Sequence, residues 1–466
     1  MDMLTFSLDS DSSISLYEQL YFHIRQAIVD DTLKTGAKLP SKRKLCQFLD
    51  VSQTTVELAY AQLLAEGYIE SVPRKGFYVL PQEELYVHRS DRKIEPIPLK
   101  KTYDFDLSPS QIDTTAFPFE RWKRHMKQVI DETNHELLAL GSVQGDFALR
   151  QEIATYLYHS RGVQCSPEQI VIGSGTEQLL PQILDLLSHA TTYGIEDPGY
   201  PLTRQLFHQQ SRSYVPIPVD ENGVCVDELE LHGVDALYVT PAHQFPTGNV
   251  LSVSRRQRLL NWALSNETYI IEDDYDSEFR YSGKPIPSLQ SIDPNERVIY
   301  LSTFSKSLMP SLRIGYMVLP TPLINRYRER YLHFTCSVPR FEQHTLATFM
   351  ASGDFEKHLN RMRKIYRRKL EIVLSNFRVY EPMIIVTGAS AGLHVVLSVN
   401  ASQSVKQLKQ AAEDSNLFIR SMSDYQITNK MSSSQFLFGF AHLPEHTIPH
   451  IIERLMQAWG ISGNTT

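Results

Sequence analysis

Residues Ser302 to Tyr316 read Ser-Thr-Phe-Ser-Lys-Ser-Leu-Met-Pro-Ser-Leu-Arg-Ile-Gly-Tyr, a polar stretch between two apolar runs. Residues 297–301 before it and 316–319 after it are predicted to be buried strands. Lys306 lies among hydroxyl side chains, and Arg313 follows seven residues later. This combination suits a phosphorylated aldehyde, because an amine can form a Schiff base while hydroxyls and a guanidinium bind the phosphate. For the lysine taken alone, a surface lysine at a strand end is the alternative.

The length and composition predict a globular protein of two or three domains. The chain has 466 residues, of which 42% are apolar and 21% are charged, and these fractions are typical of soluble proteins. The formal net charge of −7 argues against a protein that coats nucleic acid, although it is compatible with a local basic patch.

The cysteines, the N-terminus and the histidines each argue against a class of protein. The four cysteines are scattered and show no CxxC spacing, so we expect neither a disulfide framework nor a zinc site, and a reducing cytoplasm is favoured. The chain does not open with a basic region followed by an apolar stretch, and no apolar run approaches ~18 residues. We therefore expect no export and no membrane insertion. The 16 histidines show no ligand spacing, so we expect no metal.

The first eighty residues have the pattern of three helices followed by a hairpin. Apolar positions at helical spacing predict helices over residues 15–30, 42–49 and 53–66. Residues 67–70 and 77–80 are predicted to be short strands joined by a turn that contains Arg74 and Lys75. This order is that of a winged helix-turn-helix.

Short hydrogen-bonding side chains at the start of the third helix can reach base edges, and basic side chains on the second helix and the hairpin tip can bind phosphates. The residues predicted to bind DNA are Ser41, Lys42, Arg43, Ser52, Gln53, Thr54, Thr55, Arg74, Lys75 and Gly76. Residues 14–80 resemble the winged helix-turn-helix of the GntR superfamily. A small helical domain for protein contacts is the alternative.

The charge of this segment bears on how it would bind DNA. Residues 1–80 hold eight lysines and arginines against ten aspartates and glutamates, a balance of −2. The attraction must therefore come from the clusters at 42–44 and 74–75 and not from net charge. Because one copy is expected to bind weakly, we expect a dimer that presents two copies.

A polar and charged stretch without apolar periodicity follows the hairpin. We predict that residues 81–103 are a linker between a DNA-binding domain, residues 1–80, and a second domain, residues 104–466.

Further motifs for a phosphorylated cofactor precede Lys306. The strand predicted over residues 170–172 leads through Gly173-Ser174-Gly175-Thr176 into a helix over 177–187, and backbone N–H groups at such a helix start bind phosphate. Tyr200 can stack on a pyridine ring. Asp273, near the end of another predicted strand, can pair with a protonated ring nitrogen, and Tyr275 can hydrogen-bond the ring oxygen. A core tyrosine or a capping aspartate explains each one singly, but together they precede the lysine in order.

Residues 104–466 resemble a fold-type I aminotransferase, which has an α/β fold with a large domain on a mostly parallel sheet and a small C-terminal α/β domain, here from about residue 339. A GntR-type winged helix joined to such a domain resembles the MocR/GabR family of bacterial transcriptional regulators. The stretches His-Gln-Phe-Pro-Thr-Gly at 243–248 and Glu-Asp-Asp-Tyr-Asp-Ser-Glu-Phe at 272–279 are similar to that family.

The resemblance implies that Lys306 carries pyridoxal 5'-phosphate, that Asp273 faces the pyridine nitrogen, that Tyr275 faces the ring hydroxyl and that Tyr200 stacks on the ring. The residues it places around the phosphate are Gly175, Thr176, Thr303, Ser305 and Arg313. It also implies a homodimer in which the winged helix of one subunit lies against the aminotransferase-like part of the other.

The sequence departs from the pattern of the catalytic relatives at two points. They usually have Asn-Pro-Thr-Gly where this chain has Phe245-Pro-Thr-Gly, and an arginine near the last strands that binds the substrate carboxylate. Residues 431–442 contain no arginine, and loss of a bidentate partner weakens both binding and positioning. Arg204, just past Tyr200, is a candidate substitute for binding an effector.

We therefore predict a cytoplasmic, homodimeric transcription regulator that binds operator DNA and holds pyridoxal phosphate on Lys306. It would sense an amine, an amino acid or a B6 vitamer, and the change in DNA binding would reflect the difference in effector affinity between two arrangements. One alternative is an active aminotransferase with an accessory DNA-binding module. Another is a scaffold in which the cofactor is structural.

Overall fold

The computed structural model describes residues 8–82, 101–187, 191–281, 283, 286–428 and 434–463. It divides the chain into two compact units, Met1–Leu99 and Lys100–Thr466. Most of the predicted linker, residues 83–100, lies outside the described residues.

The first unit has three helices and a hairpin. The helices are α1 (Leu16–Val29), α2 (Lys42–Leu49) and α3 (Gln53–Ala65), and the hairpin strands are β1 (Ile69–Val72) and β2 (Gly76–Val79). Their apolar faces meet in one core that includes Leu20, Ile24, Leu45, Val56, Ala59, Tyr60, Leu63 and Val79. The helices and the hairpin predicted from the sequence are all present, with ends that differ by one residue or none for the helices.

Side-chain caps set the starts of the two helices of the predicted helix-turn-helix. The Ser41 hydroxyl accepts a hydrogen bond from the Lys44 N–H at 3.4 Å, and the Ser52 hydroxyl accepts one from the Thr55 N–H at 3.1 Å. Each cap satisfies a backbone donor that the first turn of a helix leaves unpaired. At the hairpin tip, Gly76 has a φ of 117°, a conformation that glycine adopts without steric cost.

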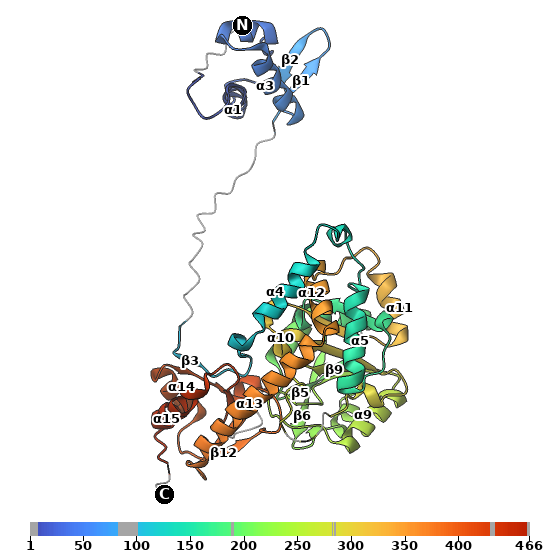
Figure 1. Ribbon diagram of the computed structural model, residues 1–466. Coiled ribbons are helices and arrows are strands. Elements are labelled where there is room, and N and C mark those ends of the chain that lie inside the picture. The colour runs from blue at the N-terminus through green and yellow to red at the C-terminus, as the bar shows by residue number, and fades with distance from the viewer. Residues whose placement is uncertain are drawn as a thin grey trace. The chain divides into compact units, whose positions relative to one another are not determined.

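The second unit is built on an eight-stranded mixed sheet (Figure 1). Its strands are β4 (Ile170–Gly173), β5 (Tyr193–Asp197), β6 (Tyr214–Asp220), β7 (Gly223–Val224), β8 (Ala236–Val239), β9 (Tyr269–Asp274), β10 (Val298–Thr303) and β11 (Gly315–Val318). The order across the sheet is β4-β11-β10-β9-β8-β5-β6-β7. The five strands from β10 to β6 are parallel to one another, so their carboxyl ends meet at one edge of the sheet.

Helices cover both faces of this sheet. They are α4 (Phe119–Val129), α5 (Phe147–Arg161), α6 (Thr176–Leu186), α7 (Pro201–Gln209), α8 (Asp227–Leu231), α9 (Val253–Ser265), α10 (Phe304–Ser307), α11 (Thr321–Arg330), α12 (Arg340–Ala351) and α13 (Asp354–Arg378). Residues of α5 and α12 share one core with Tyr300 and Tyr316, whereas residues of α6, α7 and α11 share another with Ile299 and Met317. Successive residues of β10 point to opposite cores, which explains why its apolar run is continuous.

A smaller sheet and its helices form a separate core near the C-terminus. The strands β12 (Ile384–Thr387), β13 (His394–Val399), β15 (Arg420–Ser421) and β16 (Gln435–Gly439) are ordered β12-β13-β16-β15. The helices α14 (Val405–Asp414) and α15 (Ile448–Trp459) pack on this sheet together with the C-terminal half of α13.

An early segment of the chain belongs to this small core. Strand β3 (Phe105–Asp106) pairs in parallel with β14 (Leu417–Phe418), and Leu107 and Ile112 are buried among the side chains of the small sheet. Lys369 of α13 is buried and binds Asp113, with 2.8 Å between Nζ and Oδ2. The small subdomain predicted from about residue 339 thus also draws on residues 105–113.

Candidate functional site

A pocket of about 260 Å³ lies at the carboxyl ends of β5, β8, β9 and β10. Each of these strands ends a few residues before a side chain that lines the pocket, as is usual for ligand sites of parallel sheets. The structure brings together in this pocket all nine residues that the sequence predicts for the cofactor, namely Gly175, Thr176, Tyr200, Asp273, Tyr275, Thr303, Ser305, Lys306 and Arg313.

Lys306 projects from the short helix α10, directly after β10. Its Nζ donates a hydrogen bond to the carbonyl oxygen of Ser110. Burial lowers the pKa of Lys306 to about 8, and the nearby Asp276 carboxylate opposes that shift. The amine is therefore neutral, and nucleophilic, in a substantial fraction of molecules near neutral pH.

Asp273 has one carboxylate oxygen that is left for a ligand. The Tyr238 hydroxyl donates a hydrogen bond to Oδ2, whereas the buried Oδ1 has no hydrogen-bond partner among the described residues. Burial raises the pKa of Asp273 to about 7, and the Tyr238 hydrogen bond opposes the shift. A protonated ring nitrogen at Oδ1 would satisfy this oxygen and keep the carboxylate ionised.

The opposite end of the pocket is suited to a phosphate. Gly175, with a φ of 109°, precedes α6, and a Cβ at this position would lie 3.2 Å from Nη2 of Arg313. The absence of a side chain leaves the N–H groups at the start of α6 open to the pocket. The Thr303 hydroxyl lies 2.9 Å from the Ser305 hydroxyl, and Arg313 pairs with Glu177 at 2.8 Å.

Two further side chains, His243 and Asp276, lie beside Tyr275, and sequence reasoning missed both. Nδ1 of His243 lies 3.0 Å from both carboxylate oxygens of Asp276 and 3.0 Å from the Tyr275 hydroxyl. An Nδ1–H that faces the carboxylate cannot accept the tyrosine proton, which is then free to donate into the pocket. His243 belongs to the quoted motif at 243–248, but nothing in the sequence links it to Asp276.

The wall above the pocket is apolar and aromatic. The ring of Phe245 makes edge-to-face contacts with Tyr200 at 5.3 Å and with Tyr425 at 5.2 Å. Phe245 also shares a buried cluster with Leu437 of β16, the strand near which catalytic relatives are expected to carry an arginine. Residues 431–433 of the arginine-free stretch lie outside the described residues. In the described part of that stretch, the residue that packs with Phe245 is Leu437, which is apolar.

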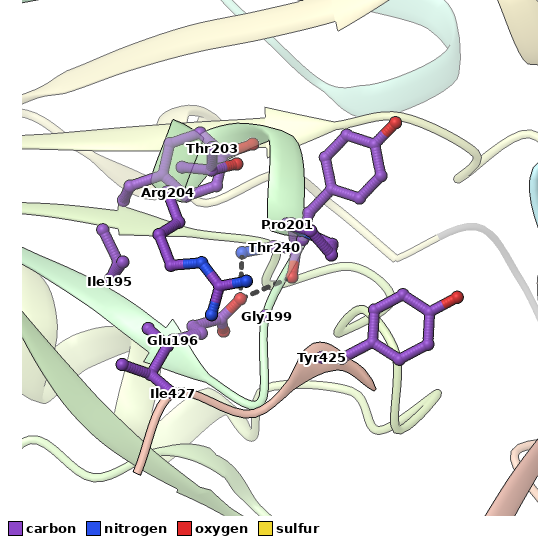
Figure 2. Close-up of a pocket in the computed structure, with 11 residues that line it drawn as sticks. Ile195, Glu196, Gly199, Pro201, Thr203, Arg204, Thr240, Tyr425 and Ile427 are labelled. Atoms are coloured by element: carbon purple, nitrogen blue, oxygen red, sulfur yellow. Dashed lines mark hydrogen bonds between the residues drawn. The ribbon is translucent and has the colours of Figure 1, made fainter. Parts of the chain in front are cut away.

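Arg204 does not line the cofactor pocket. It lines a smaller neighbouring pocket with Glu196 and Tyr425, and Figure 2 shows its side chain extending toward Glu196 and Ile427. Its Nη1 donates a hydrogen bond of 3.4 Å to the carbonyl oxygen of Gln426. Tyr200 lines both pockets, so Arg204 is adjacent to the predicted effector site but outside the group around Lys306.

The predicted DNA-binding residues occupy exposed positions on the first unit. Gln53, Thr54, Arg74 and Lys75 are exposed. Ser41 and Ser52 serve as helix caps, and the side chain of Thr55 contacts the Ser52 hydroxyl at 2.8 Å. Lys42 lies 3.7 Å from Glu57 and faces the Phe77 ring of the hairpin. Arg43 is exposed, and Gly76 begins β2 directly after the hairpin turn.

Among the described residues, no group of three or more His, Cys, Asp or Glu side chains is placed to hold a metal ion. In the same part of the chain, no helix combines the length and apolar character needed to cross a membrane.

Comparison with known proteins covers both units. Residues 16–79 match the family described as "Bacterial regulatory proteins, gntR family", and residues 104–455 match "Aminotransferase class I and II". The chain is 26% identical to the crystallised Pyrococcus horikoshii kynurenine aminotransferase, a complex with PMP, with a TM-score of 0.69 over 76% of this chain and 90% of that one.

Three curated relatives span nearly the whole chain. The uncharacterized HTH-type transcriptional regulator YdeL of Bacillus subtilis is 41% identical over 99% of this chain and 100% of its own length. The pyridoxine biosynthesis regulator PdxR of Corynebacterium glutamicum is 31% identical, with 98% of each chain covered. The probable rhizopine catabolism regulatory protein MocR of Rhizobium meliloti is 30% identical over 97% of this chain and 95% of its own.

A GntR-type winged helix and a fold-type I aminotransferase unit with a complete lysine pocket define a class of protein: a transcription regulator that binds DNA and depends on pyridoxal phosphate. Its sheet, with a mostly parallel centre, is the one predicted from the sequence. The chain belongs to the MocR/GabR family of such regulators.

When bound, pyridoxal phosphate supplies a carbonyl that reacts with primary amines and a ring that withdraws electrons. The chain's own groups prepare the pocket for it. Lys306 offers a partly neutral amine, Asp273 offers an unpaired carboxylate oxygen, and Tyr275 offers a hydroxyl proton. The N–H groups at the start of α6 and the Arg313 guanidinium would bind the phosphate.

Proposed function

We propose that this regulator senses a primary amine, an amino acid or a B6 vitamer at the Lys306 pocket and changes its affinity for operator DNA in response. The observation that supports this most directly is the convergence of nine predicted cofactor residues on one pocket whose lysine has a pKa of about 8. The names of two relatives refer to pyridoxine biosynthesis and rhizopine catabolism, which fits an effector of this chemistry.

The site residues are proposed in the roles that their positions suit. Lys306 bonds the cofactor, Asp273 binds the ring nitrogen, Tyr275 the ring oxygen, and Tyr200 contacts the ring face. The phosphate contacts come from Gly175, Thr176, Thr303, Ser305 and Arg313. On the first unit, Gln53, Thr54, Arg74 and Lys75 contact DNA directly, while Ser41 and Ser52 set the helix starts.

The effector is proposed to be held mainly by its amine and by apolar contacts. Phe245 lines the pocket and packs against Tyr425 and Leu437 behind it, whereas Arg204 lies outside the pocket. An arginine that binds a carboxylate through two hydrogen bonds contributes strongly to affinity. Substitution of Arg204 by alanine tests its role. If Arg204 binds the carboxylate of the effector, the variant should respond more weakly to amino acids but still respond to simple amines.

We also propose that the protein is a cytoplasmic homodimer. The second unit exposes large apolar side chains, with exposed fractions of 84% at Leu140, 73% at Leu138, 68% at Leu332 and 61% at Phe334. Exposed apolar side chains of this size are common at protein interfaces. Two winged helices on one dimer would offset the weak attraction expected from a unit without net positive charge. Sedimentation of the wild-type chain and of Leu140→Asp checks the oligomeric state.

The sensing proposal is tested by following cofactor absorption and DNA binding in the same titration. Purified protein is saturated with pyridoxal phosphate and titrated with amines, amino acids and B6 vitamers in the presence of its own upstream DNA. We expect one compound to change both the visible band and the DNA affinity. Lys306→Ala should abolish both changes, and Lys364→Ala, which alters an exposed lysine of α13, should abolish neither. A band that changes without any change in DNA affinity would contradict sensing through this lysine.

A further inference from the structure

A second cavity, of about 480 Å³, lies apart from the cofactor pocket. It is bounded by the C-terminal part of α5, by the first half of α13, and by residues 277–280 after β9. Figure 1 shows α5 and α13 as two long helices of the same unit. The cavity shares no lining residue with the pocket around Lys306.

Two buried ionisable side chains, Arg161 and Glu278, line it, and burial raises the pKa of Glu278 to about 7. Arg161 is 4% exposed. Its Nε donates a hydrogen bond to Asp274 at 2.7 Å, and its Nη1 donates one to the carbonyl oxygen of Ile286. Its Nη2 has no partner among the described residues. Glu278 is 9% exposed; its Oε1 accepts from the Tyr156 hydroxyl at 3.2 Å, but Oε2 has no partner there either. Buried polar atoms are seldom left unpaired in a native protein, so their presence in a cavity points to a ligand.

Three arginines on the wall, Arg280, Arg363 and Arg367, have no acidic partner in the part of the chain that the structure describes. Nε and Nη1 of Arg280 are buried and have no hydrogen-bond partner among the described residues. Arg363 donates to the Glu278 carbonyl oxygen at 2.6 Å and to Asn360 at 2.8 Å, and Arg367 donates to the Tyr281 carbonyl oxygen at 3.0 Å. These bonds fix the positions of two guanidinium groups but do not neutralise them.

The opposite wall is acidic. Glu152 of α5 and Glu356 of α13 both line the cavity. Burial raises the pKa of Glu152, and the charge of Glu356 raises it further, which shows that the two carboxylates are neighbours. Arg363 and Arg367 follow Glu356 by seven and eleven residues, or about 10 and 16 Å along the helix. The cavity therefore has an acidic end and a basic end.

We propose that this cavity is a binding site for a small zwitterion that carries a carboxylate and an ammonium group, namely a free amino acid. Arg280 and Arg363 bind the carboxylate, and Oε2 of Glu278 accepts a hydrogen bond from the ammonium group. Such a ligand would pair with the unpaired atoms of Arg280 and Glu278. It links residues 278–280 to α13, and α13 continues into the small core. This assignment is independent of the function proposed for Lys306.

The experiment must separate this cavity from the amine-reactive pocket. The cofactor is first reduced onto Lys306 with borohydride, so that an added amine can no longer exchange at that lysine. Calorimetric titrations then use each of the common α-amino acids singly, with acetate, methylammonium and inorganic phosphate as partial ligands. We expect at least one amino acid to bind, and to bind more tightly than any partial ligand.

Substitutions then locate the binding. Arg280→Gln and the near-isosteric Glu278→Gln should each weaken binding about tenfold or more, the effect of losing one charge-assisted hydrogen bond. Arg368→Gln is the matched control, because Arg368 lies on α13 but pairs with Glu445 at 3.0 Å outside the cavity. Without ligand, Arg280→Gln should melt close to the wild type, because two of the three lost nitrogens, Nε and Nη1, have no hydrogen-bond partner among the described residues.

The proposal is overturned if no amino acid binds the reduced protein, or if binding is unchanged in both cavity variants. It is also overturned if phosphate or acetate binds as tightly as any amino acid, because the cavity would then be a simple anion site. None of these results would affect the sensing proposal, which depends on unreduced Lys306.

Discussion

Burial of the Lys306 amine sets the pH range in which this chain captures its cofactor. The pKa of Lys306 is lowered from 10.5 to about 8, and only the neutral amine attacks a carbonyl. At about pH 7.5, a lysine with the ordinary pKa is neutral in roughly 0.1% of molecules, whereas one with a pKa of about 8 is neutral in roughly a quarter. The structure thus predicts a gain of about two orders of magnitude in the reactive form near neutral pH.

The assay is the rate at which the visible cofactor band appears after cofactor-free protein is mixed with excess pyridoxal phosphate. The same rate is measured with Nα-acetyl-lysine, so that titration of the cofactor itself cancels in the ratio. The protein rate should level off above about pH 8, while the rate for the free lysine should rise to about pH 10.4. The ratio should therefore be constant below about pH 8 and fall close to tenfold per pH unit above it. Lys306→Arg should give no band.

A ratio that stays constant up to about pH 10 would show that Lys306 titrates like a solvent-exposed amine, and the reasoning from burial would be wrong.

The lowered pKa of Lys306 also has a consequence for stability. Between about pH 8 and about pH 10.5 the unfolded chain binds more protons at this lysine than the folded chain does, so this group makes the protein more stable as the pH rises through that window.

Three further predictions concern the cofactor pocket, the hairpin tip and the small core. Asp273→Asn removes the charge that would face a protonated ring nitrogen, so cofactor affinity measured by absorption titration should fall at least about tenfold; unchanged affinity would show that Oδ1 does not serve the cofactor. Replacing Arg74 and Lys75 together by alanine should weaken binding to specific and unrelated DNA alike. It should also reduce the salt dependence of binding by about two phosphate contacts per winged helix. An unaltered salt slope would show that the hairpin tip does not contact the DNA. Lys369→Met leaves the Asp113 carboxylate without its cation in the small core, so the free energy of unfolding measured in denaturant should fall by about 3 kcal/mol. The double variant that also carries Asp113→Asn should regain part of that stability.

Sequence reasoning chose nine residues that line one pocket because each of them lies within a few residues of one end of a strand. Lys306 follows β10 by three residues and Tyr275 follows β9 by one, so a correct strand assignment places the side chain at the sheet edge. The winged helix was predicted equally well, because Ser41 and Ser52 are capping residues that mark helix starts locally.

The contacts that were not predicted join residues far apart in the chain. His243 and Asp276 are 33 residues apart, and Asn416 binds Asp104 across 312 residues. Neither pair has a spacing that helices or strands impose, since such contacts depend on how whole elements pack. The cavity between α5 and α13 was missed for the same reason.

The pairing of β3 with β14 determines which part of the second unit holds the end of the interdomain linker. The Asp104 N–H donates to the Asn416 carbonyl oxygen at 3.0 Å, the Leu107 N–H donates to that of Phe418 at 2.8 Å, and Asp104 also binds Arg454 of α15 at 2.8 Å. The chain that arrives from the winged helix is thus anchored to the small subdomain and not to the eight-stranded sheet. Any shift of the small subdomain against that sheet would therefore move the point at which the segment leading from the winged helix joins the second unit.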